Sequence, residues 1–271
     1  MIVVTGATGN IGRPLVEALC AAGESVTALS RSHHESTAAV TWVRADPADP
    51  ASLKPAFDGA DKLFLMAPGP QFDLTAIVDA AKTAGIEKAV LVSSQRVGSR
   101  PEEGLEPMER PVTESGLEWT VLRPGGFASN ALLWAESVRA SRSITAPFGD
   151  VGLPVIDPAD IAAVAAAALL GDGHAGLTYT LTGPALVTPR DQAKAIGEAL
   201  GEPVRFIEQT EHEAFEALTR FWPAEVVEGT LQVLGEPNDA ERTISPDVET
   251  VTGRRPNAFT GWAHRNVAAF R

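Results

Sequence analysis

The sequence is poor in cysteine and in basic residues, and both shortages exclude classes of protein. Its one cysteine, Cys20, cannot form a disulfide within the chain, which is typical of proteins from a reducing compartment. Lysine and arginine total 22 against 35 acidic residues, a formal net charge of -13, so the basic patch of a nucleic-acid-binding protein is not expected. The five histidines show no metal-ligand spacing. We therefore expect neither a nucleic-acid partner nor a metal.

Long apolar runs are also missing. The longest, Ile161 to Leu170, is too short to span a bilayer. The first residues have the pattern of a strand, with no charged region and no small-residue cleavage site of a targeting segment. The sequence therefore predicts a cytoplasmic protein with no membrane partner, and its 271 residues, 44% of them hydrophobic, suffice for a full core.

The N-terminal stretch carries the clearest motif. Ile2 to Val4 is a short apolar, β-branched run that predicts a buried strand. Gly6, Gly9 and Gly12 follow directly, then apolar residues at helical spacing, then a second strand over Ser25 to Leu29. Strand, glycine turn, helix and strand, in this order, are what a dinucleotide site needs.

Each glycine has a physical role in such a site. Gly6 permits the tight turn out of the strand, Gly9 lets the main chain approach a pyrophosphate, and Gly12 allows close packing of the helix on the sheet. The helix start then offers unpaired N–H groups and a positive dipole end to the phosphates. The alternative is a structural glycine-rich turn that binds nothing.

The residues after the second strand favour NADP over NAD. An NAD site has an acid about twenty residues after the glycines, bonded to the ribose 2′-hydroxyl. This chain has Ser30, Arg31 and Ser32 there. Arg31 can pair with a 2′-phosphate and stack on adenine, with a serine donating a hydrogen bond. His33 and His34 are candidates for the same phosphate, although a surface loop is the favoured explanation of both.

Strand and helix patterns alternate along the first half of the chain. Further strands are expected at 40–43, 61–67, 89–92 and 119–122, and helices at 52–57, 72–84 and 102–115. Such alternation predicts an α/β fold with a doubly wound parallel sheet. Later patterns predict helices at 158–170, 189–200, 211–221 and 223–234 and strands at 179–181 and 204–207. We expect a cofactor domain over 1–125 and a smaller α+β substrate lobe over 126–271, with part of 150–182 returning to the sheet.

Two features carry a family resemblance. The G-x-x-G-x-x-G spacing resembles the extended and atypical short-chain dehydrogenase/reductases. The segment SGLEWTVLRPGGFASN is similar to a signature of NmrA-like proteins, an atypical branch of that group, and the similarity extends to IDPADIAAVAAAAL, TYTLTGPALVTP and TGRRPNAFTGW. It covers nearly the whole chain.

The resemblance implies a Rossmann fold and a role in redox chemistry. The NmrA-like family includes NADPH-dependent reductases of quinones, dyes and flavonoid-type compounds, and also regulators that bind dinucleotide without turnover. It implies that Asp46, after the third strand, bonds the adenine amino group, whereas simple turn chemistry explains this aspartate as well. The full expected cofactor set is Gly6, Thr8, Gly9, Asn10, Ile11, Gly12, Arg31, Ser32, Asp46, Met66, Ala67, Pro68, Ser93, Ser94, Pro124 and Gly125.

The ordinary catalytic pair of short-chain dehydrogenase/reductases, Tyr-x-x-x-Lys, is not found. The one tyrosine, Tyr179, lies in a later strand pattern without a lysine four residues on, and is expected to be structural. By alignment to the family the pair falls near Pro101 and Leu105, which transfer no proton. Hydride transfer to electron-poor acceptors such as quinones depends on positioning of the reactants more than on acid catalysis. If an acid is needed, the candidates are Gln95, Glu109 and Arg110, unless these are solvated surface residues.

We therefore expect an NADPH-dependent reductase of a conjugated aromatic or quinone-like molecule. Aromatic and polar side chains after the sixth strand and in the later lobe are candidates for the substrate wall: Phe127, Asn130, Trp134, Phe148, Phe221 and Trp222. Two alternatives stay open: a non-catalytic NADP(H) sensor that regulates a partner protein, and a tailoring enzyme that uses the dinucleotide structurally. A homo-oligomeric assembly also stays open.

Overall fold

The computed structural model describes residues 1–66 and 72–271, which form two compact units. The first unit contains Met1–Pro124, Pro158–Leu181 and Asp247–Arg254. The second contains Gly125–Asp157, Thr182–Pro246 and Arg255–Arg271. The chain thus passes between the units several times, and each unit has its own core.

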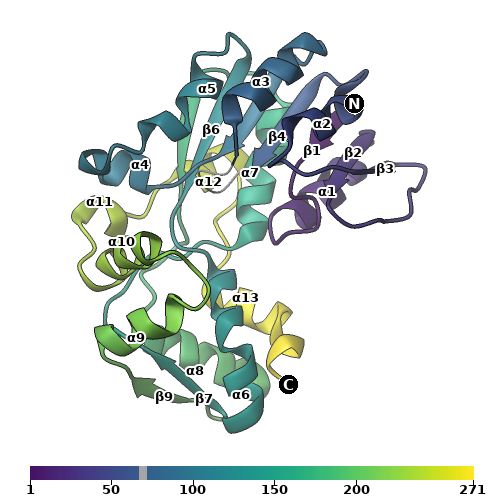
Figure 1. Ribbon diagram of the computed structural model, residues 1–271. Coiled ribbons are helices and arrows are strands. Elements are labelled where there is room, and N and C mark those ends of the chain that lie inside the picture. The colour runs from purple at the N-terminus through teal and green to yellow at the C-terminus, as the bar shows by residue number, and fades with distance from the viewer. Residues whose placement is uncertain (67–71) are drawn as a thin grey trace. The chain divides into compact units, whose positions relative to one another are not determined.

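A seven-stranded parallel sheet forms the centre of the first unit (Figure 1). Its strands are β1 (Ile2–Val4), β2 (Val26–Ser30), β3 (Val40–Arg44), β4 (Lys62–Met66), β5 (Lys88–Val92), β6 (Glu118–Pro124) and β8 (Leu177–Leu181). Their spatial order is β3-β2-β1-β4-β5-β6-β8. This confirms the predicted doubly wound sheet, since the order reverses between β1 and β4.

Helices cover both faces of this sheet. They are α1 (Gly12–Ala21), α2 (Pro50–Phe57), α3 (Leu74–Thr83), α4 (Arg96–Ser99), α5 (Arg110–Thr113), α7 (Pro158–Leu170) and α12 (Asp247–Thr252). Successive strand residues point to opposite faces, so Val3, Leu65 and Leu91 join one core with α2, α3 and α5. The helices α1 and α7 pack against each other, and α7 also contacts β4, β5 and β6. Burial on both faces explains why the central strands β1, β4 and β5 appear in the sequence as continuous apolar runs.

The helix expected over 102–115 is wrong. The segment forms two 3₁₀ turns, η1 (Pro101–Glu103) and η2 (Glu106–Met108), followed by the four-residue helix α5. Gly104 has a left-handed φ of 61°, which ends the first turn, and prolines start each of the later pieces. Repeated prolines remove helix donors and prevent one continuous helix.

The second unit is built mostly of helices. They are η3 (Ala128–Trp134), α6 (Ala135–Ser141), α8 (Pro189–Leu200), α9 (Glu211–Leu218), α10 (Ala224–Gly235), α11 (Asp239–Arg242), α13 (Phe259–Arg265) and η4 (Val267–Phe270). Two strands that pair in parallel, β7 (Ser143–Ala146) and β9 (Arg205–Glu208), complete it. A core of small and aromatic side chains, including Ile196, Trp262 and Phe270, joins α6, α8 and α13. The sequence patterns did not indicate β7 or α6.

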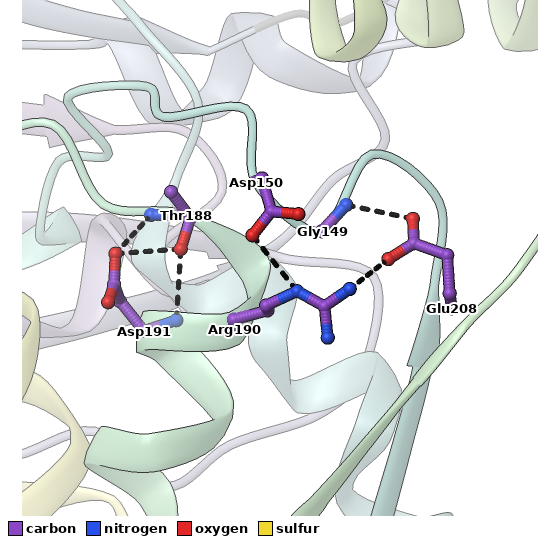
Figure 2. Close-up of polar contacts among 6 residues, drawn as sticks. All are labelled: Gly149, Asp150, Thr188, Arg190, Asp191 and Glu208. Atoms are coloured by element: carbon purple, nitrogen blue, oxygen red, sulfur yellow. Dashed lines mark hydrogen bonds and ion pairs between the residues drawn. The ribbon is translucent and has the colours of Figure 1, made fainter.

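A polar network surrounds the start of α8, as Figure 2 shows. Thr188 caps the helix, and its hydroxyl and the carboxylate of Asp191 form a reciprocal capping box. Arg190, in the first turn, donates from Nε to Asp150 at 3.0 Å and from Nη2 to Glu208 at 2.6 Å. The network connects α8 with the loop after β7 and with the end of β9.

Candidate functional site

The carboxyl ends of β1 and β4 are tied together by Thr5. Its side chain is fully buried, its N–H donates to the carbonyl of Phe64 at 3.0 Å, and its Oγ1 accepts from the N–H of Met66 at 2.7 Å. This is the point where the strand order reverses, and ligands of open α/β sheets bind there. The glycine turn therefore follows β1 at the point of the sheet edge where the strand order reverses.

The three glycines form a turn that disfavours residues with a Cβ, most strongly at Gly12. Gly6 has φ +62°, a left-handed conformation. A Cβ on Gly12 would lie 2.1 Å from the carbonyl oxygen of Gly6, and one on Gly9 would lie 3.2 Å from the same oxygen. Gly12 thus allows the first turn of α1 to press on the glycine loop itself, whereas the sequence pattern suggested contact with the sheet.

The start of α1 is suited to an anion. Its N-cap residue is Ile11, which makes no side-chain cap, and the first turn contains no acidic residue. The N–H of Arg13 donates to the carbonyl of Gly9 at 3.1 Å and Pro14 has no N–H, so an anion here would be bound by the main chain at the glycine turn and Gly12, with no competing carboxylate in the first turn. Of the other residues expected in the turn, Thr8 is half-buried and Asn10 is exposed, whereas the side chain of Ile11 lies in the core, so Ile11 can offer only main chain.

Arg31 follows the last residue of β2 and is exposed. The hydroxyl oxygen of Ser30 accepts from the N–H of Ser32 at 3.1 Å and lies 3.1 Å from Nε2 of His34. The ring of His34 packs on Trp42, with centroids 4.4 Å apart. These contacts fold the segment after β2 into a small loop, at the start of which Arg31 is exposed.

Asp46 follows β3 and takes part in a turn. Its Oδ1 accepts from the N–H of Ala48 at 3.0 Å, and its own N–H donates to the hydroxyl of Ser52 at 2.9 Å. The turn chemistry considered for this aspartate is therefore present. Met66 is half-buried at the end of β4, with its sulfur 3.6 Å from the position of a Cβ on Gly6. Ala67 and Pro68 lie outside the described residues.

A buried carboxylate lies beyond the ends of β5 and β6. Glu109, 6% exposed, accepts from the hydroxyl of Ser93 at 2.6 Å. It also accepts two hydrogen bonds from Arg123, at 2.9 Å from Nε and 2.7 Å from Nη2. Gly98 makes room for this guanidinium, because a Cβ there would lie 2.8 Å from Nη1. In the folded chain both oxygens of this carboxylate therefore accept hydrogen bonds from Ser93 or Arg123.

The other residues expected near the catalytic position make hydrogen bonds or ion pairs with neighbouring parts of the chain. The hydroxyl of Ser94 accepts from the N–H of Arg96 at 3.2 Å, and the N–H of Gln95 donates to the carbonyl of Pro124 at 3.0 Å. Gly125, the next residue, is half-buried at the start of the second unit. Arg110 is exposed and lies 3.5 Å from Glu114 on the same short helix.

Tyr179 pairs with a neighbouring turn. Its hydroxyl lies 2.8 Å from Nδ1 of His174. Burial, with a smaller contribution from the charge of Asp247, raises the pKa of Tyr179 above its ordinary value of 10.0. A neutral tyrosine held at a strand edge by a histidine is consistent with the structural role expected for it.

The six candidates for the substrate wall belong to the second unit and lie in different surroundings. Trp134 packs on the core of that unit, Phe127 is half-buried beside Ile156, and Asn130 is exposed. Phe148 packs against Ala214, Val227 and Leu231. Phe221 and Trp222, between α9 and α10, are 75% and 37% exposed.

No role was predicted for Arg123 from the sequence, whereas the structure pairs it with the buried Glu109. The signal was present: an arginine inside the otherwise apolar end of β6 needs a carboxylate partner if it is to be buried. Which carboxylate it takes could not be read from spacing alone. Among the described residues, no group of three or more metal-ligating side chains gathers, and no helix is long and apolar enough to cross a membrane.

Comparisons with known proteins agree with this geometry. Residues 6–172 match the model of a family described as NAD(P)H-binding. The chain is 35% identical, over its full length and 99% of the relative, to (4-alkanoyl-5-oxo-2,5-dihydrofuran-3-yl)methyl phosphate reductase of Streptomyces griseus. It is 32% identical, again over its full length and 99% of the relative, to NAD(P)H azoreductase of Xenophilus azovorans.

A solved structure extends the similarity to the whole fold. An NADPH-dependent quinone oxidoreductase from Escherichia coli superposes with a TM-score of 0.78 at 25% identity, covering 98% of this chain and 99% of the other. The similarity therefore includes both units and is not limited to the glycine turn.

Proposed function

Because the chain belongs to the NAD(P)H-binding family, in its NmrA-like branch of atypical short-chain dehydrogenase/reductases, we propose that it is an NADPH-dependent reductase of a conjugated aromatic or quinone-like small molecule. The observation that carries the proposal is the arrangement after β1 and β2. There a glycine turn in which Gly12 has no room for a Cβ, a helix start without a side-chain cap, and an exposed arginine lie on consecutive elements.

The residues present fit the cofactor. The main chain of the glycine turn and of Gly12 would bind the pyrophosphate, and Gly12 is needed there because a Cβ would collide with the loop that forms this cradle. Arg31 would bind the 2′-phosphate, and Asp46 the adenine. When bound, NADPH supplies a hydride to the substrate.

The contacts of the candidate proton donors support an electron-poor hydride acceptor. Glu109 is bound by Ser93 and Arg123, so it is poorly placed to donate a proton. Arg110 pairs with Glu114 at the surface. Pro101 and Leu105, at the aligned positions of the usual tyrosine and lysine, carry no acid. A substrate that needs no protein acid at the moment of hydride addition fits these residues best.

Turnover tests the proposal. Purified protein is mixed with NADPH and a panel of quinones, azo compounds and aromatic cations, and oxidation of NADPH is followed by its absorbance. Binding of NADPH is measured in parallel by its fluorescence. Acceptor-dependent oxidation supports the reductase, whereas tight NADPH binding with no turnover across the panel contradicts it and favours the sensor.

A further inference from the structure

The three residues that follow β5, here called the β5 loop, stay attached to β6 after the two strands stop pairing. The last pair of the ladder is Val92 with Leu122, and β6 continues to Pro124. Beyond this pair, the N–H of Ser93 donates to the carbonyl of Leu122 at 2.7 Å. The N–H of Gln95 donates to the carbonyl of Pro124 at 3.0 Å. The β5 loop therefore runs along the end of β6.

A side-chain connection reinforces this attachment. The hydroxyl of Ser93 donates to Oε1 of Glu109 at 2.6 Å. Nε and Nη2 of Arg123, in β6, donate to the two oxygens of the same carboxylate at 2.9 and 2.7 Å. Hydrogen bonds to a charged group are about twice as strong as those between neutral groups. Glu109 therefore joins the β5 loop to the end of β6 by a second path, besides the main chain.

The helix α4 is fitted to this connection. Gly98 lies in α4, and a Cβ there would lie 2.8 Å from Nη1 of Arg123. The guanidinium thus occupies the space that a side chain at this position would take. Glu109 is 6% exposed, so water competes little for its hydrogen bonds. A buried carboxylate with these partners fixes the positions of the β5 loop, α4 and β6 relative to one another.

The β5 loop lies in one half of the sheet, and the segment assigned to the adenine nucleotide lies in the other. The strand order reverses between β1 and β4, and each half of a doubly wound sheet binds one nucleotide of a dinucleotide. Arg31, after β2, belongs to the half formed by β1, β2 and β3. The half that contains β4, β5 and β6 is therefore left for the nicotinamide nucleotide.

We propose that Glu109 is a positioning residue for the nicotinamide half of NADPH and that it acts by holding the β5 loop through Ser93. The inference rests on the proposed function in one respect, the binding of NADPH at the carboxyl ends of these strands. A loop that is ordered before binding loses less conformational entropy when the nicotinamide nucleotide binds. Both oxygens of Glu109 accept from Ser93 or Arg123, so its effect on the cofactor passes through the loop.

Binding of a whole and of a half cofactor tests the assignment. NADPH contains both nucleotides, whereas adenosine 2′,5′-bisphosphate contains the adenine and the 2′-phosphate but no nicotinamide. Calorimetric titration compares the two ligands in wild type and in Ser93→Ala, which removes the hydroxyl and leaves the pair of Glu109 and Arg123 in place. We expect Ser93→Ala to weaken NADPH binding about three- to tenfold, through added disorder of the loop, and to leave the bisphosphate unchanged.

Glu109→Gln tests whether the effect passes through the carboxylate. We expect it to weaken NADPH at least as much as Ser93→Ala does, again with the bisphosphate unchanged. Combining the two substitutions should cause no further loss, because the two residues act as one unit. All titrations are made below the unfolding transition of every variant, so that lower stability does not enter the affinities.

Three results of these titrations would overturn the proposal. Unchanged NADPH affinity in either variant would show that the loop needs no support from Glu109. Equal weakening of NADPH and the bisphosphate would mean a general loosening of the unit. Losses that add in the combined variant would mean that Ser93 acts without Glu109.

The matched control is Glu103→Gln. Glu103 also pairs with an arginine, Arg96, which donates from Nε at 3.0 Å and from Nη2 at 2.6 Å. This pair joins α4 to η1 and does not include the β5 loop or β6. We expect Glu103→Gln to leave the affinities for both ligands unchanged. A loss of NADPH affinity equal to that of Glu109→Gln would mean that any ion pair of this region has the same effect, against a specific role of Glu109.

The outcomes for the two proposals are separable. Turnover of quinones by wild type, together with equal effects of Ser93→Ala on the two ligands, would leave the reductase in place and overturn the positioning role. A selective loss of NADPH affinity in Ser93→Ala and Glu109→Gln, without turnover of any acceptor by wild type, would support the positioning role and contradict the reductase.

Discussion

The guanidinium of Arg123 and the carboxylate of Glu109 form a two-point ion pair, Nε to Oε1 at 2.9 Å and Nη2 to Oε2 at 2.7 Å. The side chain of Glu109 is 8% exposed and that of Arg123 is 25% exposed. The hydrogen bonds to Glu109 raise the pKa of Arg123 above its already high ordinary value. The pair ties the segment before α5 to the end of β6, beside the expected cofactor crevice.

Removing one partner of this pair should destabilise the protein. Glu109→Gln would leave the guanidinium of Arg123 without its charge partner, and we expect the free energy of unfolding to fall by about 2–4 kcal/mol. Urea unfolding measures this as a lower midpoint with an unchanged slope. The control is Arg110→Ala, which breaks an exposed pair with Glu114 and should change stability by less than about 0.5 kcal/mol. Equal effects of the two variants would contradict a special role for the buried pair.

The glycine turn gives a second prediction. Gly12→Ala would place a Cβ 2.1 Å from the carbonyl oxygen of Gly6, so the start of α1 must move away from the loop. We expect a stability loss of about 1–3 kcal/mol or more and weaker NADPH binding. Gly261→Ala, in the helix α13, is the matched control, because its Cβ would meet only the side chain of Arg265 at 3.4 Å. Calorimetric melting and NADPH titration of both variants check this. Unchanged NADPH affinity in Gly12→Ala would show that the loop does not need the close approach.

Much of the first unit could be predicted from the sequence because its central strands are buried on both faces. Such strands appear as short apolar runs, and the predicted runs at 2–4 and 89–92 coincide with β1 and β5 to within a residue or so. Local signals also predicted the start of α8, where Thr188 and Pro189 stand at the cap and first position. These features depend on neighbours in sequence.

The features that were missed depend on contacts distant in sequence. The strand β7 has only four residues and pairs with β9, about sixty residues later, so its own residues carry little signal. The partner of Arg123 is fourteen residues away across a broken helical segment. A cavity between α9 and α10 is lined in part by Phe148, from another part of the chain. The spacing of residues along the sequence does not predict such packing.

The capping box of α8 predicts a dependence of stability on pH. Hydrogen bonds from the hydroxyl and N–H of Thr188 lower the pKa of Asp191 below its ordinary value of 3.8. A carboxyl whose pKa is lowered by folding contributes stability that is present above the unfolded value and is lost as pH falls through the folded value. Asp191→Asn should therefore lower stability at neutral pH, and its difference from wild type should shrink below about pH 4.

Urea unfolding at a series of pH values measures this difference. The pH-dependent part should be smaller when Asp191→Asn is made in a Thr188→Ala background, because one of the two hydrogen bonds is already lost. A difference that stays constant from neutral to acidic pH would show that the charge of Asp191 contributes nothing and that only helix capping geometry matters.

Cofactor choice depends on Arg31 and is the prediction closest to function. Its exposed guanidinium lies just after β2, beside the loop in which Ser30 binds Ser32 and His34. A charge-assisted hydrogen bond to the 2′-phosphate is worth about 1.5–3 kcal/mol, so Arg31→Ala should weaken NADPH binding about ten- to a hundredfold. NADH lacks this phosphate, and its affinity should hardly change beyond lost stacking on adenine.

Arg31→Asp should reverse the preference. An aspartate repels the 2′-phosphate and can accept a hydrogen bond from the 2′-hydroxyl of NADH, so it acts both against one cofactor and for the other. Titrating NADPH and NADH against wild type and the two variants separates these effects. If wild type binds both cofactors equally, or if Arg31→Ala weakens both to the same extent, Arg31 recognises only the part that they share. The preference for NADP would then have to come from a different residue or be absent, because a group that cannot distinguish the two ligands contributes nothing to their difference in affinity.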